Sequence, residues 1–195
     1  MKLLTIVHTI FSRIILIILI VVAIIPIFLI MLLPEHIRFS NRFLYRVEYW
    51  FYWAVLKCSL IPITYEGTEH IPSQPVIFAS NHQSSLDIPL VGVLPRGKPH
   101  VWLARAELLK TVFLRFIVSR LAIVADVTKG TKAGRSLIRL MKLVEGKDID
   151  VMIFPEGARY PDDKVHEFFG GFVILAKTLK RPVVPVRICG ANKVY

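Results

Sequence analysis

A run of twenty residues without a charge, residues 14–33, constrains the fold of this chain more than any other feature. The run reads IILIILIVVAIIPIFLIMLL. At about 1.5 Å per residue, a helix of this length extends roughly 30 Å, the thickness of the hydrocarbon core of a bilayer. The run is too long for a signal peptide, and no small-residue cleavage site follows it. We expect a helix that enters a membrane, and Pro26 leaves open whether it spans the bilayer or dips into one leaflet.

A second helix is predicted at 39–58, after a break at Pro34, and both Ser40 and Asn41 are candidate caps. Its pattern is amphipathic, basic and rich in aromatic residues, which suits a membrane interface; an ordinary surface helix packed on the core has the same pattern. We therefore expect residues 1–60 to form an N-terminal membrane-embedded helical pair. The distribution of basic residues favours a cytoplasmic location for the rest of the chain. These residues are Lys2 and Arg13 before the apolar run, and Arg38, Arg42, Arg46 and Lys57 after it.

Composition narrows the range of partners. The chain of 195 residues has a net charge of +11, which suits a polyanion such as nucleic acid or an anionic lipid surface. The apolar run favours membrane lipids and argues against nucleic acid. The two cysteines, Cys58 and Cys189, form neither a disulfide framework nor a metal-ligand pattern, which is typical of a protein in a reducing compartment. No metal site is predicted.

From residue 61 onward the sequence alternates between predicted strands and helices. This alternation indicates a single α/β domain over 61–195, with a mostly parallel sheet and helices packed against it. The predicted strands are 63–66, 76–80, 101–104, 121–125, 150–154 and 183–188. The predicted helices are 86–94, 105–120, 132–146 and 171–179.

The segment from Asn81 to Asp87 holds the first candidate site. His82 follows a predicted buried strand and Asp87 begins the next helix, so the two side chains can face each other across the turn. A carboxylate on one imidazole nitrogen fixes the tautomer and leaves the other nitrogen as a base near neutral pH. The same spacing, Ser84-x-x-Asp87, is also a capping box, in which Asp87 would only satisfy amides at the start of the helix.

A second polar cluster, from Pro155 to Arg159, also follows a predicted buried strand. Gly157 allows close approach to the backbone, Arg159 offers a planar fork suited to phosphate, and Glu156 can orient a hydroxyl. Taken alone, this stretch is equally compatible with a turn that carries a surface arginine.

Three blocks together resemble the glycerophospholipid acyltransferase family. They are the His-x4-Asp motif of His82 and Asp87, the segment Phe154-Pro-Glu-Gly-x-Arg159, and Val184-Pro-Val186 in the last predicted strand. Within the family the bacterial 1-acylglycerol-3-phosphate acyltransferases are most similar, from about residue 61 to residue 192. The resemblance implies a membrane-bound O-acyltransferase that makes phosphatidate from lysophosphatidate.

The resemblance also implies roles for individual residues. His82, oriented by Asp87, is expected to act as the general base on the acceptor hydroxyl, which attacks the thioester of acyl-CoA or acyl-carrier protein. Glu156, Gly157 and Arg159 are expected to bind the acceptor, with Arg159 on its phosphate. Arg105 occupies a position where the family often has a lysine, and we assign it to substrate binding. The reaction is expected to need no cofactor besides the acyl donor, and no metal.

The chain departs from the family pattern where an arginine often meets the phosphate. The matching residues, 123–127, contain no arginine, which leaves Lys129, Lys132 and Arg135 as candidates for that charge. The acceptor therefore remains open between lysophosphatidate, another lysolipid and glycerol-3-phosphate. An alternative of a different class is a non-catalytic membrane protein that binds anionic lipids.

Overall fold

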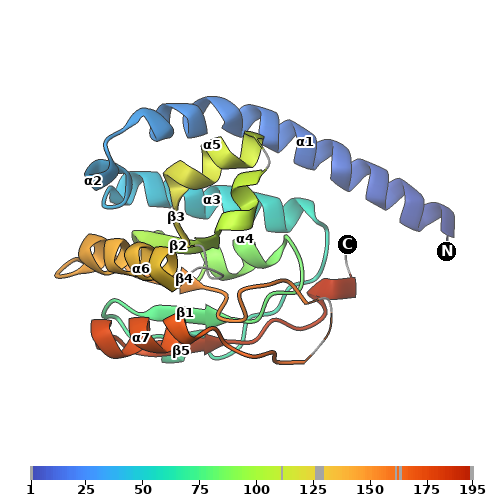
Figure 1. Ribbon diagram of the computed structural model, residues 1–195. Coiled ribbons are helices and arrows are strands. Elements are labelled where there is room, and N and C mark those ends of the chain that lie inside the picture. Colours follow the sequence, from blue (N-terminus) through green and yellow to red (C-terminus); the bar gives the residue numbers. More distant parts are fainter. Residues whose placement is uncertain (1, 111, 126–129, 161, 163, 194–195) are drawn as a thin grey trace.

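The computed structural model describes the chain except residues 1, 111, 126–129, 161, 163 and 194–195. Its centre is a five-stranded sheet with the strand order β3-β2-β4-β1-β5, in which all neighbours are parallel (Figure 1). The central strand, β4, and its neighbour β1 are buried at every position, as expected for a parallel sheet covered on both faces. The strands are β1 (Ile77–Ser80), β2 (His100–Arg105), β3 (Ala122–Ala125), β4 (Asp150–Ile153) and β5 (Val183–Val186).

Helices cover both faces of the sheet. The helices of this part of the chain are α4 (Asp87–Gly92), α5 (Val112–Leu121), α6 (Gly130–Val144) and α7 (Gly170–Leu179). Leu140 of α6 and Leu175 of α7 are fully buried in one core cluster with one face of the strands. A second cluster, on the opposite face of the sheet, contains Phe78 of β1, Met152 of β4 and Val91 of α4. The predicted α/β architecture with a parallel sheet is therefore confirmed.

The N-terminal sixty residues form three helices that pack on this core. They are α1 (Lys2–Leu32), α2 (Glu35–Arg38) and α3 (Arg42–Cys58). The side chain of Asn41 accepts hydrogen bonds from the backbone N–H groups of Phe43 and Leu44, so Asn41 is the cap of α3. Tyr52 and Leu56 of α3 are buried against α4, and α1 lies along α3 and α5 (Figure 1).

Among the residues that the structure describes, no helix reaches the length and apolar character that a membrane crossing requires. The predicted N-terminal membrane-embedded helical pair at 1–60 is therefore not supported by the structure. Much of α1 and part of α3 nevertheless present apolar side chains to the surface. Among the described phenylalanine and tryptophan side chains, Phe43 and Trp50 of α3 are the most exposed, at 70% and 69%.

Two predicted elements are wrong. Residues 63–66 form no strand, because Tyr65 turns into the core, where its hydroxyl donates to the carbonyl of Leu90 at 3.1 Å. The predicted helix at 105–120 is divided: Arg105 pairs with Ala125 as the last residue of β2, and a 3₁₀-helix, Ala106–Lys110, precedes α5. Helix periodicity does not reveal this division, because the pairing partner of Arg105 is remote in sequence.

Candidate active site

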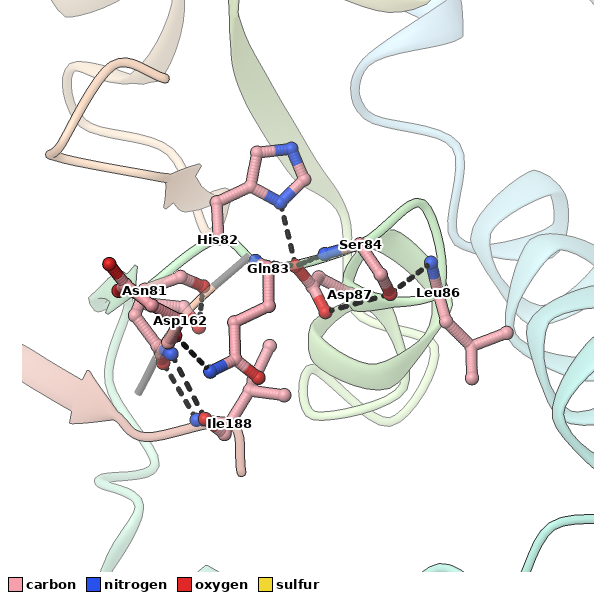
Figure 2. A network of polar contacts seen from close by, with 9 residues as sticks. Asn81, His82, Gln83, Ser84, Leu86, Asp87, Asp162 and Ile188 are labelled. Atoms are coloured by element: carbon pink, nitrogen blue, oxygen red, sulfur yellow. Dashed lines mark hydrogen bonds and ion pairs between the residues drawn. The ribbon is translucent and has the colours of Figure 1, made fainter. Parts of the chain in front are cut away.

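His82 and Asp87 form a hydrogen-bonded pair at the carboxyl end of β1. The Nδ1–H of His82 donates to Oδ2 of Asp87 at 2.7 Å, across the turn between β1 and α4 (Figure 2). With Nδ1 protonated and held in this way, Nε2 carries the free lone pair and is the available base. The side chain of His82 is 15% exposed, so a substrate can reach it.

Asp87 is completely buried, and backbone donors compensate for the burial of its charge. Its Oδ2 also accepts hydrogen bonds from the N–H groups of Gln83, at 2.5 Å, and Ser84, at 2.7 Å (Figure 2). The bond from Ser84 belongs to the capping-box pattern, so both interpretations of this spacing hold at once. The carboxylate supports the start of α4 and, through the same oxygen, orients the imidazole.

Two further contacts immobilise His82, and the sequence analysis did not assign either. The imidazole is stacked on Phe154, the residue that follows β4, with ring centroids 4.0 Å apart. Asn81 exchanges two hydrogen bonds with the backbone of Ile188, of 2.9 and 2.7 Å, and so ties the end of β1 to the segment after β5. Phe154 and Asn81 both belong to the sequence segments that the sequence analysis singled out. Their contacts could not be predicted, because they depend on the order of the strands in the sheet.

The loop 155–169 brings the second predicted cluster to the same edge of the sheet. The N–H of Tyr160 donates to the carbonyl of His82 at 2.8 Å, and Gly157 makes the turn with a φ of 64°. Arg159, between these two residues, is exposed. The structure therefore brings His82, Asp87, Glu156 and Gly157 to one edge of the sheet, and Arg159 follows in the same loop with an exposed side chain.

Glu156 is the buried acid of this loop. Its side chain is 7% exposed, and its Oε1 has no hydrogen-bond partner among the residues described. Burial raises the pKa of its carboxyl group, whereas the backbone N–H and the charge of His166, together with the charge of His82, lower it. A buried carboxylate with one free oxygen can accept a hydrogen bond from a substrate hydroxyl.

The remaining predicted residues lie farther along the sheet. Arg105 ends β2, which β4 separates from β1, so Arg105 is two strands away from His82. Of the candidate replacements for the family arginine, Lys129 lies outside the described residues and Arg135 is exposed on α6. Within the described part of the chain, no group of three or more His, Cys, Asp or Glu residues is arranged to hold a metal.

Two apolar cavities lie beneath α1 and α3. A cavity of about 560 Å³ is bounded by α1, by α3 and by Trp102 of β2. The second, of about 450 Å³, is bounded by α1, by α3 and by Ser85 and Leu86, next to the His82–Asp87 turn. Phe51 and Tyr52 of α3 line both cavities. Each volume is in the range of sites that bury small ligands.

The sequence is similar to those of known acyltransferases. The family model described as Acyltransferase matches residues 62–189. A chloroplastic 1-acyl-sn-glycerol-3-phosphate acyltransferase of Brassica napus is 32% identical over 133 residues, which is 66% of this chain and 38% of that protein. A protein of Mycoplasma genitalium named as a probable 1-acyl-sn-glycerol-3-phosphate acyltransferase is 28% identical over 164 residues, 81% of this chain and 58% of that protein.

The fold is similar to that of a solved structure. The 1-acyl-sn-glycerophosphate acyltransferase PlsC from Thermotoga maritima superposes with a TM-score of 0.71 at 23% identity, covering 98% of this chain and 76% of that chain. The match to the Brassica napus protein spans well under half of that relative. The family match, in contrast, covers more than half of the 195 residues and contains every residue of the site. On this evidence the chain belongs to the acyltransferase family.

Proposed function

We propose that this protein is a membrane-associated O-acyltransferase that acylates the free hydroxyl of 1-acyl-sn-glycerol-3-phosphate and so forms phosphatidate. The observation that carries the proposal is the His82–Asp87 pair, in which the Nδ1–H is bound to a buried carboxylate and Nε2 is left as a base. The names of the relatives from Brassica napus and Mycoplasma genitalium support this acceptor.

The proposed reaction needs only a base and a positioned thioester. Nε2 of His82 removes the proton of the acceptor hydroxyl while the hydroxyl oxygen attacks the thioester carbonyl of acyl-CoA or acyl-carrier protein. The carbon–sulfur bond then breaks, the ester remains on the acceptor, and the thiolate leaves and takes up the proton. Asp87 keeps the imidazole in the required tautomer and stabilises its positive charge.

Binding of the acceptor falls to the loop 155–169 in this proposal. Arg159 is exposed and its planar guanidinium suits a phosphate, while the free oxygen of Glu156 suits a hydroxyl group. The turn at Gly157 lies between these two residues, and the N–H of Tyr160, directly after Arg159, donates to the carbonyl of His82. Arg105 is proposed as a further substrate contact on β2, at the same edge of the sheet.

The hydrocarbon parts of the substrates need apolar surroundings. The cavities beneath α1 and α3 supply them, and the second cavity is bounded by Ser85 and Leu86, three and four residues after His82. The exposed apolar side chains of α1 and α3 support binding to a membrane, from which a lysolipid would enter. The distribution of basic residues supports the cytoplasmic face.

Two other functions remain to be tested against this one. The missing arginine at 123–127 favours trials of other lysolipids and of glycerol-3-phosphate as acceptors. The second alternative is a protein that binds anionic lipids without catalysis. Lipid binding alone does not require an accessible imidazole that a buried carboxylate orients. The His82–Asp87 pair therefore favours the enzyme.

The test is thioester-dependent acylation of 1-acyl-sn-glycerol-3-phosphate by the purified protein in lipid vesicles. We expect activity in the wild type and a loss of at least about a thousandfold in His82→Ala, because the proposed reaction uses Nε2 of His82 as its base. His36→Ala, at a histidine of α2, is the matched control and should keep full activity. Equal activity in wild type and His82→Ala would refute the mechanism. Absence of activity with every acceptor would favour the lipid-binding function.

A further inference from the structure

A second imidazole–carboxylate pair stands beside the His82–Asp87 pair, in the loop 155–169. Nε2 of His166 lies 3.0 and 3.2 Å from the two carboxylate oxygens of Asp162. The ring of His166 is stacked on Tyr160, with ring centroids 3.7 Å apart and planes at 15°. His166 is therefore fixed on one edge and on one face, although nothing in the sequence motifs marks it.

This pair is connected to the turn that carries His82. Tyr160, which supports the ring of His166, donates its N–H to the carbonyl of His82. Asp162 accepts a hydrogen bond at its backbone carbonyl from the side chain of Gln83, at 2.6 Å, and the two residues lie together in Figure 2. Both partners of His166 are thus bonded to the two consecutive residues at the start of the catalytic turn.

Glu156 lies within reach of both pairs. Its carboxyl group faces the backbone N–H of His166. The titratable groups that influence the pKa of Glu156 are His166 and Asp162 of the same loop, and His82 after β1. Burial raises the pKa of Glu156, and the N–H and the charge of His166 lower it. One oxygen, Oε1, stays buried without a partner in the described part of the molecule. A buried carboxyl group with one unpartnered oxygen therefore lies in the loop that is bonded to the turn of His82.

We propose that His166, held by Asp162 and Tyr160, is a positioning residue that keeps Glu156 in place as the hydrogen-bond acceptor for the acyl acceptor. The ligand class of Oε1 is a neutral or cationic donor group on the acceptor, such as a glycerol hydroxyl. This inference rests on the proposed function, because it assigns Glu156 to the acceptor and not to the thioester. It predicts that changes at His166 affect acceptor binding while the transfer step at His82 is preserved.

The test compares His166→Ala with His166→Gln, and uses His70→Gln as the matched control. His70 forms an imidazole–carboxylate pair with Glu69 at 3.4 Å, but both side chains are strongly exposed and lie in a separate 3₁₀-helix. His166→Gln keeps an N–H group for Asp162 without a positive charge, whereas His166→Ala keeps neither. For each variant we would measure kcat, the KM of acceptor and donor, and the pH dependence of the acceptor Kd without donor.

We expect His166→Ala to raise the acceptor KM about tenfold, with kcat and the donor KM changed by less than about threefold. Loss of His166 removes an interaction that lowers the pKa of Glu156, so this carboxyl group takes up a proton at a higher pH. As the pH falls, acceptor binding should therefore begin to weaken at a higher pH than in the wild type. Protonation of the acceptor phosphate changes the Kd equally in the wild type and in every variant, so it does not affect the difference between their pH profiles. His166→Gln should restore most of the KM but keep the altered pH dependence.

Three results would overturn the inference. They are a wild-type acceptor KM in His166→Ala, an equal loss for acceptor and donor, and an unchanged pH dependence of the acceptor Kd in both variants. The last result would reduce His166 to a structural support of its loop. If the wild type itself failed to acylate or bind any lysolipid while His70→Gln and wild type remained folded, the proposed function would fail, which is a different outcome from a failure confined to His166.

Discussion

The imidazole of His82 lies flat against the ring of Phe154, with centroids 4.0 Å apart and an angle of 10° between the planes. Phe154 is in turn stacked on Trp102 with centroids 5.5 Å apart. The three rings come from the ends of β1 and β4 and from β2, which are neighbours in the sheet. The hydrogen bond to Asp87 fixes one edge of the imidazole, and this row of rings fixes its face.

Phe154→Ala should lower kcat about tenfold, because the imidazole loses the surface that keeps it in the reactive orientation. Phe154→Leu fills much of the same space without a flat ring, and kcat should fall less than in the alanine variant. Single-turnover rates at saturating substrate would measure both effects. If both variants kept the wild-type rate while folded, the stacking would have no part in orienting His82.

Asp87→Asn should lower kcat by about 10³–10⁴-fold, because a neutral amide neither enforces the required tautomer nor stabilises the imidazolium. The variant should also lose about 1–3 kcal/mol of unfolding free energy, since Oδ2 accepts two buried backbone N–H groups. Steady-state kinetics and urea denaturation would check the two effects. Asp148→Asn is the control, because Asp148 forms an exposed ion pair with Arg42 and should change neither quantity appreciably.

Glu156→Gln should raise the acceptor KM and, at neutral pH, stabilise the protein by about 1 kcal/mol, because the buried charge is removed. Burial raises the pKa of Glu156 above its ordinary value of 4.5, so the native state holds the proton more tightly than the unfolded chain. The protonated Glu156 therefore stabilises the native state relative to the ionised form; this stabilisation is complete below pH 4.5 and is lost as the pH rises through the raised pKa. Urea denaturation of wild type and variant between pH 4 and pH 8 would measure the difference, which should widen with increasing pH. A constant difference would contradict the assignment.

Arg159→Ala should raise the KM of a phosphate-bearing acceptor about tenfold to a hundredfold and leave the donor KM unchanged. The cause is the loss of the planar fork in the acceptor loop. Lys164→Ala removes an exposed cation from the same loop and serves as the control. Steady-state kinetics with each substrate varied in turn would measure the effect; equal increases for both substrates would refute the phosphate assignment.

Replacement of Phe43 and Trp50 by serine should reduce sedimentation with anionic lipid vesicles by about tenfold. Both side chains are about 70% exposed, so the melting temperature should be nearly unchanged. Ile138→Ser, at an exposed residue of α6, removes apolar surface elsewhere and should bind vesicles as the wild type does. Deletion of residues 1–60 is a poorer experiment, because Tyr52 and Leu56 belong to the core. If the double variant still sedimented fully, α3 would not be the membrane-binding face.

Features with local causes were predictable from the sequence. Asn41 caps α3 through its own side chain, and the buried strands β1 and β4 appear as short apolar runs with polar residues directly after them. The rule that the carboxyl ends of parallel strands share one edge was enough to place His82 and Glu156 together. The five-residue separation of His82 and Asp87 across a turn allowed the two side chains to face each other, but it was equally compatible with a capping box alone.

Features with remote causes were not predictable. The segment 63–66 has the composition of a strand, but no neighbouring strand pairs with it, and Tyr65 bonds to Leu90 instead. The supports of the site have the same origin: Phe154 stacks on His82 because β4 lies beside β1, and Tyr160 reaches the carbonyl of His82 because the loop folds back.

The sequence by itself determined the local conformations and the chemical groups, because helix caps, strand burial and the His82–Asp87 spacing depend on neighbours a few residues away. It also carried the three blocks that place the chain in its family. Only the tertiary structure decided the strand order, the ring stacking on His82 and the surroundings of Glu156. These depend on contacts between segments remote in sequence, such as Gln83 with Asp162 and Asn81 with Ile188, which form only when the whole core is packed.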